Sequence, residues 1–69
     1  MKFSAWNILK GKVTAITPGS VNPEVVLELA GGQVVTSIIT KKSVADLGLF
    51  VGKEACTVIK SSEVMIAAD

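Results

Sequence analysis

One short segment, Thr40 to Gly48, predicts a helix in a chain whose other apolar runs alternate like β-strands. Thr40 and Ser43 are both residue types that cap helix N-termini, and Ser43 with Asp46 fits the Ser-x-x-Asp form of a capping box. Gly48 stands where a left-handed residue closes a helix C-terminus. We therefore expect a single helix at about 41–47, too short for the crossover between two parallel strands.

Five runs around this helix predict strands, because apolar and polar residues alternate in them or β-branched residues dominate. Three runs precede the helix and two follow it: 3–16, 24–30, 33–39, 54–60 and 63–68. The third run has few charges, which favours a strand covered on both faces. Three strands, a helix and two strands is the order of an OB fold. The sequence therefore predicts an all-β protein, a five-stranded OB-like Greek-key barrel with one short helix between strands 3 and 4.

Two glycine features refine this prediction. Gly31-Gly32 separates the second and third runs and predicts a two-residue hairpin loop. Gly11 lies inside the first run, where a glycine indicates a bulge or the close approach of another backbone.

The small size of the chain limits its stability. Its 69 residues make one domain, residues 1–69, of a length that is marginally stable alone. Folds this small usually need disulfides, a metal or oligomerisation. Cys56 is the only cysteine and histidine is absent, so no internal disulfide and no zinc site are expected. Hydrophobic residues make up 49% of the chain, which is more than so small a core can hide. We expect a homo-oligomer.

Charge and hydropathy exclude several classes of protein. The net charge is only +1, with seven lysines and no arginine, which is too weak to grip a nucleic-acid backbone by charge alone. No apolar run approaches the roughly 20 residues of a membrane span. The N-terminus has no signal-peptide hydrophobic region, and a lone cysteine suits a reducing compartment. We expect a cytoplasmic protein that binds neither nucleic acid nor a membrane.

Catalytic groups are scarce. Without histidine the usual serine or cysteine triad cannot form, and the six carboxylates show no acid/base pair. Cys56 is expected to be a buried structural thiol, and Gly31-Gly32 lacks the lysine of a phosphate loop. We therefore expect no enzyme. What remains are three groups of hydrogen-bond donors that would suit an oxyanion if they converged, and each also has a structural explanation. They are Ser4, Trp6 and Asn7; Thr40 and Ser43; and Lys60, Ser61 and Ser62.

Several segments together resemble the molbindins (Mop proteins), which are single TOBE domains. They include Ser4-Ala5-Trp6-Asn7, Leu9-Lys10-Gly11-Lys12-Val13, Gly19-Ser20-Val21-Asn22, Ile39-Thr40 with Ser43-Val44, and Val58-Ile59-Lys60-Ser61-Ser62. The resemblance covers nearly the whole chain. It implies an OB-type barrel with strands exchanged between subunits, assembled as a trimer of dimers. It also implies that the ligand is molybdate or tungstate, bound by hydrogen bonds without a metal–protein bond.

The resemblance further implies which residues bind the oxyanion at subunit interfaces. Ser4, Trp6, Lys60 and Ser61 would come from one subunit, and Thr40 and Ser43 from its neighbour. Backbone amides of the turn Gly19, Ser20, Val21 and Asn22 would form a second class of site near the threefold axis.

One position departs from the family pattern, because Trp6 stands where molbindins usually have arginine. Arginine carries a permanent charge and a fork of donors, whereas tryptophan offers one N–H and a large apolar surface. The hypothesis is a drier pocket that still binds and whose selectivity is shifted toward tungstate.

Three functions remain open at this point. The first is storage or buffering of the oxyanion. The second is a nucleic-acid-binding OB module, which would need basic and aromatic residues along a strand face; the aromatics here are Phe3, Trp6 and Phe50, and none is placed at strand alternation. The third is a regulatory TOBE module that acts with a molybdate or tungstate transporter.

Overall fold

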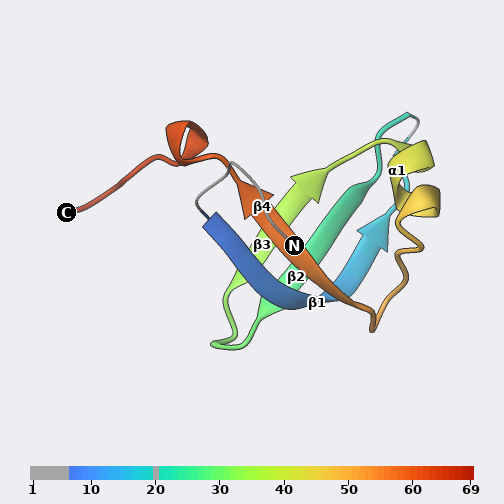
Figure 1. The fold of residues 1–69 in the computed structure, drawn as a ribbon, viewed down its shortest axis with the longest axis horizontal. Helices are drawn as coiled ribbons and strands as arrows, with labels where there is room; N and C mark the ends of the chain where they lie inside the picture. The colour runs from blue at the N-terminus through green and yellow to red at the C-terminus, as the bar shows by residue number, and fades with distance from the viewer. Residues whose placement is uncertain (1–6, 20) are drawn as a thin grey trace.

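A computed structural model describes residues 7–19 and 21–69 of the chain. Their strands form one curled antiparallel sheet, and a short helix lies at one end of it (Figure 1). The elements in chain order are β1 (Asn7–Thr17), β2 (Glu24–Leu29), β3 (Val34–Ile38), α1 (Lys41–Asp46), β4 (Glu54–Ile59) and the 3₁₀ turn η1 (Ser61–Glu63). The sheet order is β3-β2-β1-β4, and the helix falls between the third and fourth strands as predicted. Neither helical segment in this part of the chain is long and apolar enough to cross a membrane.

Strand β1 holds the sheet together, because its first half pairs with β4 and its second half pairs with β2. The register between β1 and β2 shifts between Val13 and Ala15, which marks a β-bulge. Residues directly opposite each other share a face, so the bulge places Ile16 on the face of its buried partner Val25. Simple alternation along the sequence would have placed Ala15 there instead.

Gly11 lies where the two pairings of β1 overlap. A Cβ at this position would lie 2.8 Å from the carbonyl oxygen of Glu28 and 3.1 Å from Cδ2 of Leu29. The close approach of another backbone is therefore confirmed, whereas the bulge occurs farther along the strand. We expect Gly11→Ala to lower the free energy of unfolding by about 1–3 kcal/mol, the usual cost of overpacking.

Gly31→Ala is the matched control for this substitution. A Cβ on Gly31 meets nothing within 4 Å, and Gly31 is not among the glycines with positive φ. Urea denaturation of both variants would compare them. An equal loss of stability in the two would contradict the steric argument.

The core enclosed by the curled sheet is small. Val13, Val25 and Leu27 are its buried side chains, at 1%, 1% and 5% exposure. Partly buried residues from β1, β4, the helix and its flanks pack against them: Ile16, Ile39, Val44, Leu49 and Ala55. Many other large apolar side chains of the described residues remain exposed. The excess of hydrophobic residues in the composition therefore appears as uncovered surface on the single chain.

Two expectations about the β2–β3 hairpin are wrong. Its loop has three residues, because the N–H of Leu29 donates to the carbonyl of Gln33 at 2.7 Å. Gly32 closes this loop with a φ of +86°, as in three-residue hairpin loops. Strand β3 is also not covered on both faces, since Val34 and Ile38 on one face are 61% and 67% exposed. The strand forms an edge of the sheet.

The predicted fifth strand, 63–68, does not form within the described residues. Glu63 ends η1, and residues 64–69 have no regular secondary structure. Met65 and Ile66 are 92% and 90% exposed, and the tail runs away from the sheet in Figure 1. A strand needs a neighbouring strand for its backbone hydrogen bonds. The tail has no such neighbour in the described part of this chain, so the sheet has four strands rather than five.

Candidate oxyanion-binding site

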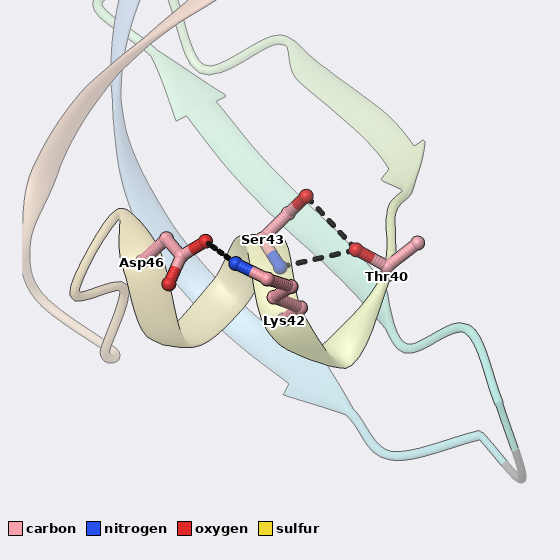
Figure 2. Close-up of polar contacts among 4 residues, drawn as sticks. All are labelled: Thr40, Lys42, Ser43 and Asp46. Atoms are coloured by element: carbon pink, nitrogen blue, oxygen red, sulfur yellow. Dashed lines mark hydrogen bonds and ion pairs between the residues drawn. The ribbon is translucent and has the colours of Figure 1, made fainter.

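Thr40 and Ser43 form a hydroxyl pair at the start of α1 (Figure 2). Thr40 is the N-cap: its backbone is extended, and its Oγ1 accepts a hydrogen bond from the N–H of Ser43 at 3.0 Å. The same Oγ1 donates to Oγ of Ser43 at 2.9 Å. The predicted capping box between Ser43 and Asp46 is wrong, because Asp46 instead accepts from Nζ of Lys42 at 2.8 Å.

The surroundings of this hydroxyl pair are polar and cationic. Thr40 is exposed and Ser43 is half-buried. Lys41 and Lys42 occupy the first turn, which contains no acidic residue. The Lys42–Asp46 ion pair is well exposed, with 83% and 61% of the side chains accessible, so it contributes little to stability. The Thr40 and Ser43 hydroxyls can donate to an anion, although helix capping alone also accounts for their geometry.

The other end of α1 is closed by a glycine turn, as the sequence predicts. Gly48 has a φ of +62°, and its N–H donates to the carbonyl of Ala45 at 3.0 Å. The N–H of Leu49 donates to the carbonyl of Val44, also at 3.0 Å. These two bonds define a Schellman motif, and both Val44 and Leu49 pack against the core.

Lys53 adds a contact that sequence reasoning missed. Its Nζ donates to the carbonyl oxygens of Leu47 at 2.7 Å and Gly48 at 3.1 Å. The only available signal was the general tendency of lysine to bind carbonyls at helix C-termini. Because Lys53 follows the helix by several residues, this tendency did not single it out.

Lys60 and Ser61 lie at the end of β4, where the chain enters η1. Both are exposed, and Lys60 makes no side-chain capping bond. Asn7, at the start of β1, pairs with Ile59 and donates through Nδ2 to its carbonyl at 3.3 Å. The start of β1 is thus beside the end of β4. Two further predicted site residues, Ser4 and Trp6, lie outside the described residues.

The two groups of predicted ligands are not brought together in one chain. In Figure 1, α1 lies at one end of the long axis and η1 lies toward the other end. The hydroxyl pair Thr40–Ser43 is therefore remote from Lys60 and Ser61. A site containing both groups needs a second copy of the chain.

The turn predicted to form a second site lies at the helix end of the sheet. The N–H of Ile39, the residue before Thr40, donates to the carbonyl of Pro23 at 3.2 Å, which ties this turn to the start of α1. The turn is tight, since a Cβ on Gly19 would lie 2.5 Å from the carbonyl oxygen of Asn22. Val21 is 67% exposed, and Ser20 lies outside the described residues.

A broad groove on the outer face of the sheet contains none of the predicted ligands. Its volume is about 670 Å³, and Lys10, Lys12, Thr14, Glu28, Glu54 and Cys56 contribute to its lining. Lys12 lies opposite Glu28 on β2 and Glu54 on β4, so the groove carries charges of both signs. The Cys56 thiol is half-buried rather than fully buried as expected. Within residues 7–19 and 21–69, no group of three or more Cys, Asp or Glu side chains could hold a metal ion.

Comparison with known proteins agrees with the resemblance seen in the sequence. The TOBE domain family matches residues 4–66. The chain is 57% identical over 68 residues to molybdenum-pterin-binding protein 3 of Clostridium pasteurianum, covering 99% of this chain and 100% of that relative.

Two solved structures have nearly the same fold. MopII from Clostridium pasteurianum superposes with a TM-score of 0.90 at 52% identity, covering 97% of this chain and 100% of that one. The cytoplasmic molybdate-binding protein ModG, with molybdate bound, gives a TM-score of 0.91 at 51% identity over 94% of this chain and 46% of that one. The chain therefore belongs to the TOBE-domain family, within its molbindin (Mop) group.

Proposed function

We propose that this protein binds molybdate or tungstate at interfaces between its own copies and serves as a cytoplasmic store or buffer of that oxyanion. The observation that carries the proposal is the likeness, at 51% identity and a TM-score of 0.91, to the cytoplasmic protein ModG with molybdate bound. The remote positions of the two ligand groups on one chain support a site shared between copies.

Each proposed site combines donors from two chains. Lys60 and Ser61 of one copy, together with its Ser4 and Trp6, face Thr40 and Ser43 of another. Lys60 supplies positive charge for the dianion, and hydrogen bonds to a charged group are roughly twice as strong as neutral ones. Because Oγ1 of Thr40 donates to Oγ of Ser43, the serine hydroxyl proton can point to the ligand. Chains of hydrogen bonds of this kind strengthen one another.

The proposed assembly is a hexamer, a trimer of dimers, in which a tail segment of one copy adds to the sheet of another. Edge strand β3 presents Val34 and Ile38, and the tail presents Met65 and Ile66, all largely exposed on the single chain. An extended segment added to an open sheet edge gains main-chain hydrogen bonds and buries its alternate side chains. Association of this kind would also supply the stability that so short a chain lacks.

Two finer features complete the proposal. Backbone amides of the turn Gly19, Ser20, Val21 and Asn22 form a second class of oxyanion site, which lies at the same end of the sheet as α1. Trp6, which replaces the usual arginine of the family, removes a charge from the main site. With fewer charged donors, the pocket is drier and its preference shifts toward tungstate.

Calorimetric titration with molybdate, tungstate and sulfate tests the proposal. We expect the wild type to bind both metal oxyanions and to reject sulfate. Ser43→Ala and Lys60→Met should each weaken binding by about tenfold or more, because hydrogen bonds to charged groups are worth about 1.5–3 kcal/mol.

Lys12→Met is the control for loss of one positive charge, since Lys12 lies on the outer groove away from the proposed site. It should bind like the wild type. No heat with either metal oxyanion would refute the proposed function. Unchanged affinity in both Ser43→Ala and Lys60→Met would refute the assignment of the site.

A further inference from the structure

We propose that Lys53 is a positioning residue for the oxyanion site: its ammonium fixes the C-terminal end of α1, and so holds the Thr40 and Ser43 hydroxyls at the other end in place. The inference rests on the proposed function. Lys53 itself touches no proposed ligand atom and acts through the helix.

Helix α1 cannot hold its own orientation. It has six residues and none of them is buried. Isolated helices shorter than about 12 residues are marginal in water. Its first turn carries Lys41 and Lys42 at the positive end of the helix dipole, which is unfavourable, and its last turn has no basic residue. The direction of the helix axis therefore depends on contacts with the rest of the chain.

Lys53 provides such a contact from a well-anchored position. Its Nζ bonds the carbonyls of Leu47 and Gly48, at 2.7 and 3.1 Å, and so places a cation at the negative end of the helix. The backbone carbonyl of Lys53 accepts from the N–H of Val13 at 2.9 Å, and the neighbouring Gly52 donates to the carbonyl of Val13 at 2.8 Å. Val13 is 1% exposed. One side chain thus couples the end of α1 to the most buried part of β1.

This coupling bears directly on the hydroxyl pair. At 1.5 Å per residue, a six-residue helix is only about 9 Å long, so a tilt at one end displaces the other. Ile39 holds the start of the helix, because it packs against the core and donates to Pro23. Without the ammonium, the rest of the helix is attached chiefly through the partly buried Val44 and Leu49 and can pivot about Ile39, which moves Ser43. Binding groups lose affinity when the elements that support them are loose, because the ligand must then order them.

Three variants test the inference: Lys53→Met, Lys53→Arg and Lys12→Met. We expect Lys53→Met to weaken molybdate binding by about tenfold, the lower end of what loss of an outer-shell partner costs a metal site. Lys53→Arg keeps a cation with several donors and should restore most of the affinity. Lys12→Met removes the same charge from the outer face of the sheet and should bind like the wild type.

A second measurement separates positioning from simple stabilisation. Hydrogen exchange of the Ser43 amide, which donates to Oγ1 of Thr40 in the capping contact, should be faster in ligand-free Lys53→Met than in the wild type. A purely structural role would lower the melting temperature but leave folded-state affinity and Ser43 exchange unchanged. That result would overturn the inference.

The outcomes also separate this inference from the proposed function. A wild type that binds neither molybdate nor tungstate refutes the function itself. A wild type that binds, together with a Lys53→Met variant of equal affinity, refutes only the role of Lys53. If Lys53→Met does not fold, Lys53→Gln replaces it, because the amide retains donors for the two carbonyls. We expect Lys53→Gln to bind molybdate more weakly than the wild type does. Wild-type affinity and wild-type Ser43 exchange in Lys53→Gln and Lys53→Arg alike, with Lys53→Met unfolded, would overturn the inference.

Discussion

Removal of residues 64–69 is expected to convert the protein to a monomer that no longer binds molybdate. The deleted tail contains Val64, Met65 and Ile66, which are 44%, 92% and 90% exposed on the single chain. Burying a large apolar side chain stabilises an association by roughly 1.5–3 kcal/mol. Loss of three such groups from every copy would remove much of the driving force for assembly. The proposed ligands Lys60 and Ser61 remain in the truncated chain, so loss of binding would follow from loss of the neighbouring copy.

Native mass spectrometry and molybdate calorimetry on the same samples measure both effects. Deletion of Asp69 alone is the control, because it shortens the chain without removing an apolar side chain and should leave mass and affinity unchanged. The double variant Met65→Ser, Ile66→Ser should be intermediate, with an assembly that dissociates on dilution. A truncated protein of unchanged oligomeric mass would show that the tail does not hold the copies together.

The second large effect is expected in the core. Leu27→Ala should lower the free energy of unfolding by about 2–5 kcal/mol, through lost apolar burial and the cavity that remains. Leu27 is 5% exposed, and Val13 and Val25 are the other buried apolar side chains of this cluster. Small domains are stable by only about 5–15 kcal/mol in total, so this loss is a large fraction. The core has few other contacts to compensate.

Urea denaturation at constant protein concentration measures this loss. Leu27→Met is the matched control, since it nearly conserves volume and should cost less than about 1.5 kcal/mol. Equal destabilisation by alanine and methionine would mean that Leu27 acts through its shape rather than through the volume it fills.

Local sequence rules predicted most of the secondary structure. Alternation of apolar and polar residues indicated β1 and β2, β-branched residues indicated β3 and β4, and a threonine followed by a glycine eight residues later bounded α1. These signals succeed because side-chain period and capping preference act over a few neighbouring residues. The pairing of Thr40 with Ser43 is of the same kind, so this half of the candidate site could be read directly from the sequence.

The errors share a different origin, because each depends on what lies next to a segment in space. Strand β3 was expected to be covered on both faces, but it lies at the edge of the sheet. The fifth strand was expected at 63–68, but the described chain offers it no neighbour. The capping box is an exception: it failed because Thr40 rather than Ser43 caps the helix, so Asp46 lies in the last turn, where it pairs with Lys42.

The sequence by itself therefore determined the types and order of β1 to β4 and α1, the residues at the helix caps and the set of hydrogen-bond donors, since all of these follow from residue chemistry over short distances. Only the tertiary structure decided where the elements lie relative to one another. It decided that β1 bulges after Val13, that Lys53 bonds the end of α1, and that η1 and α1 lie toward opposite ends of the molecule. These outcomes depend on which backbone and side-chain groups come into contact once the sheet has curled. Such contacts join residues of different segments, so no periodicity along the chain encodes them.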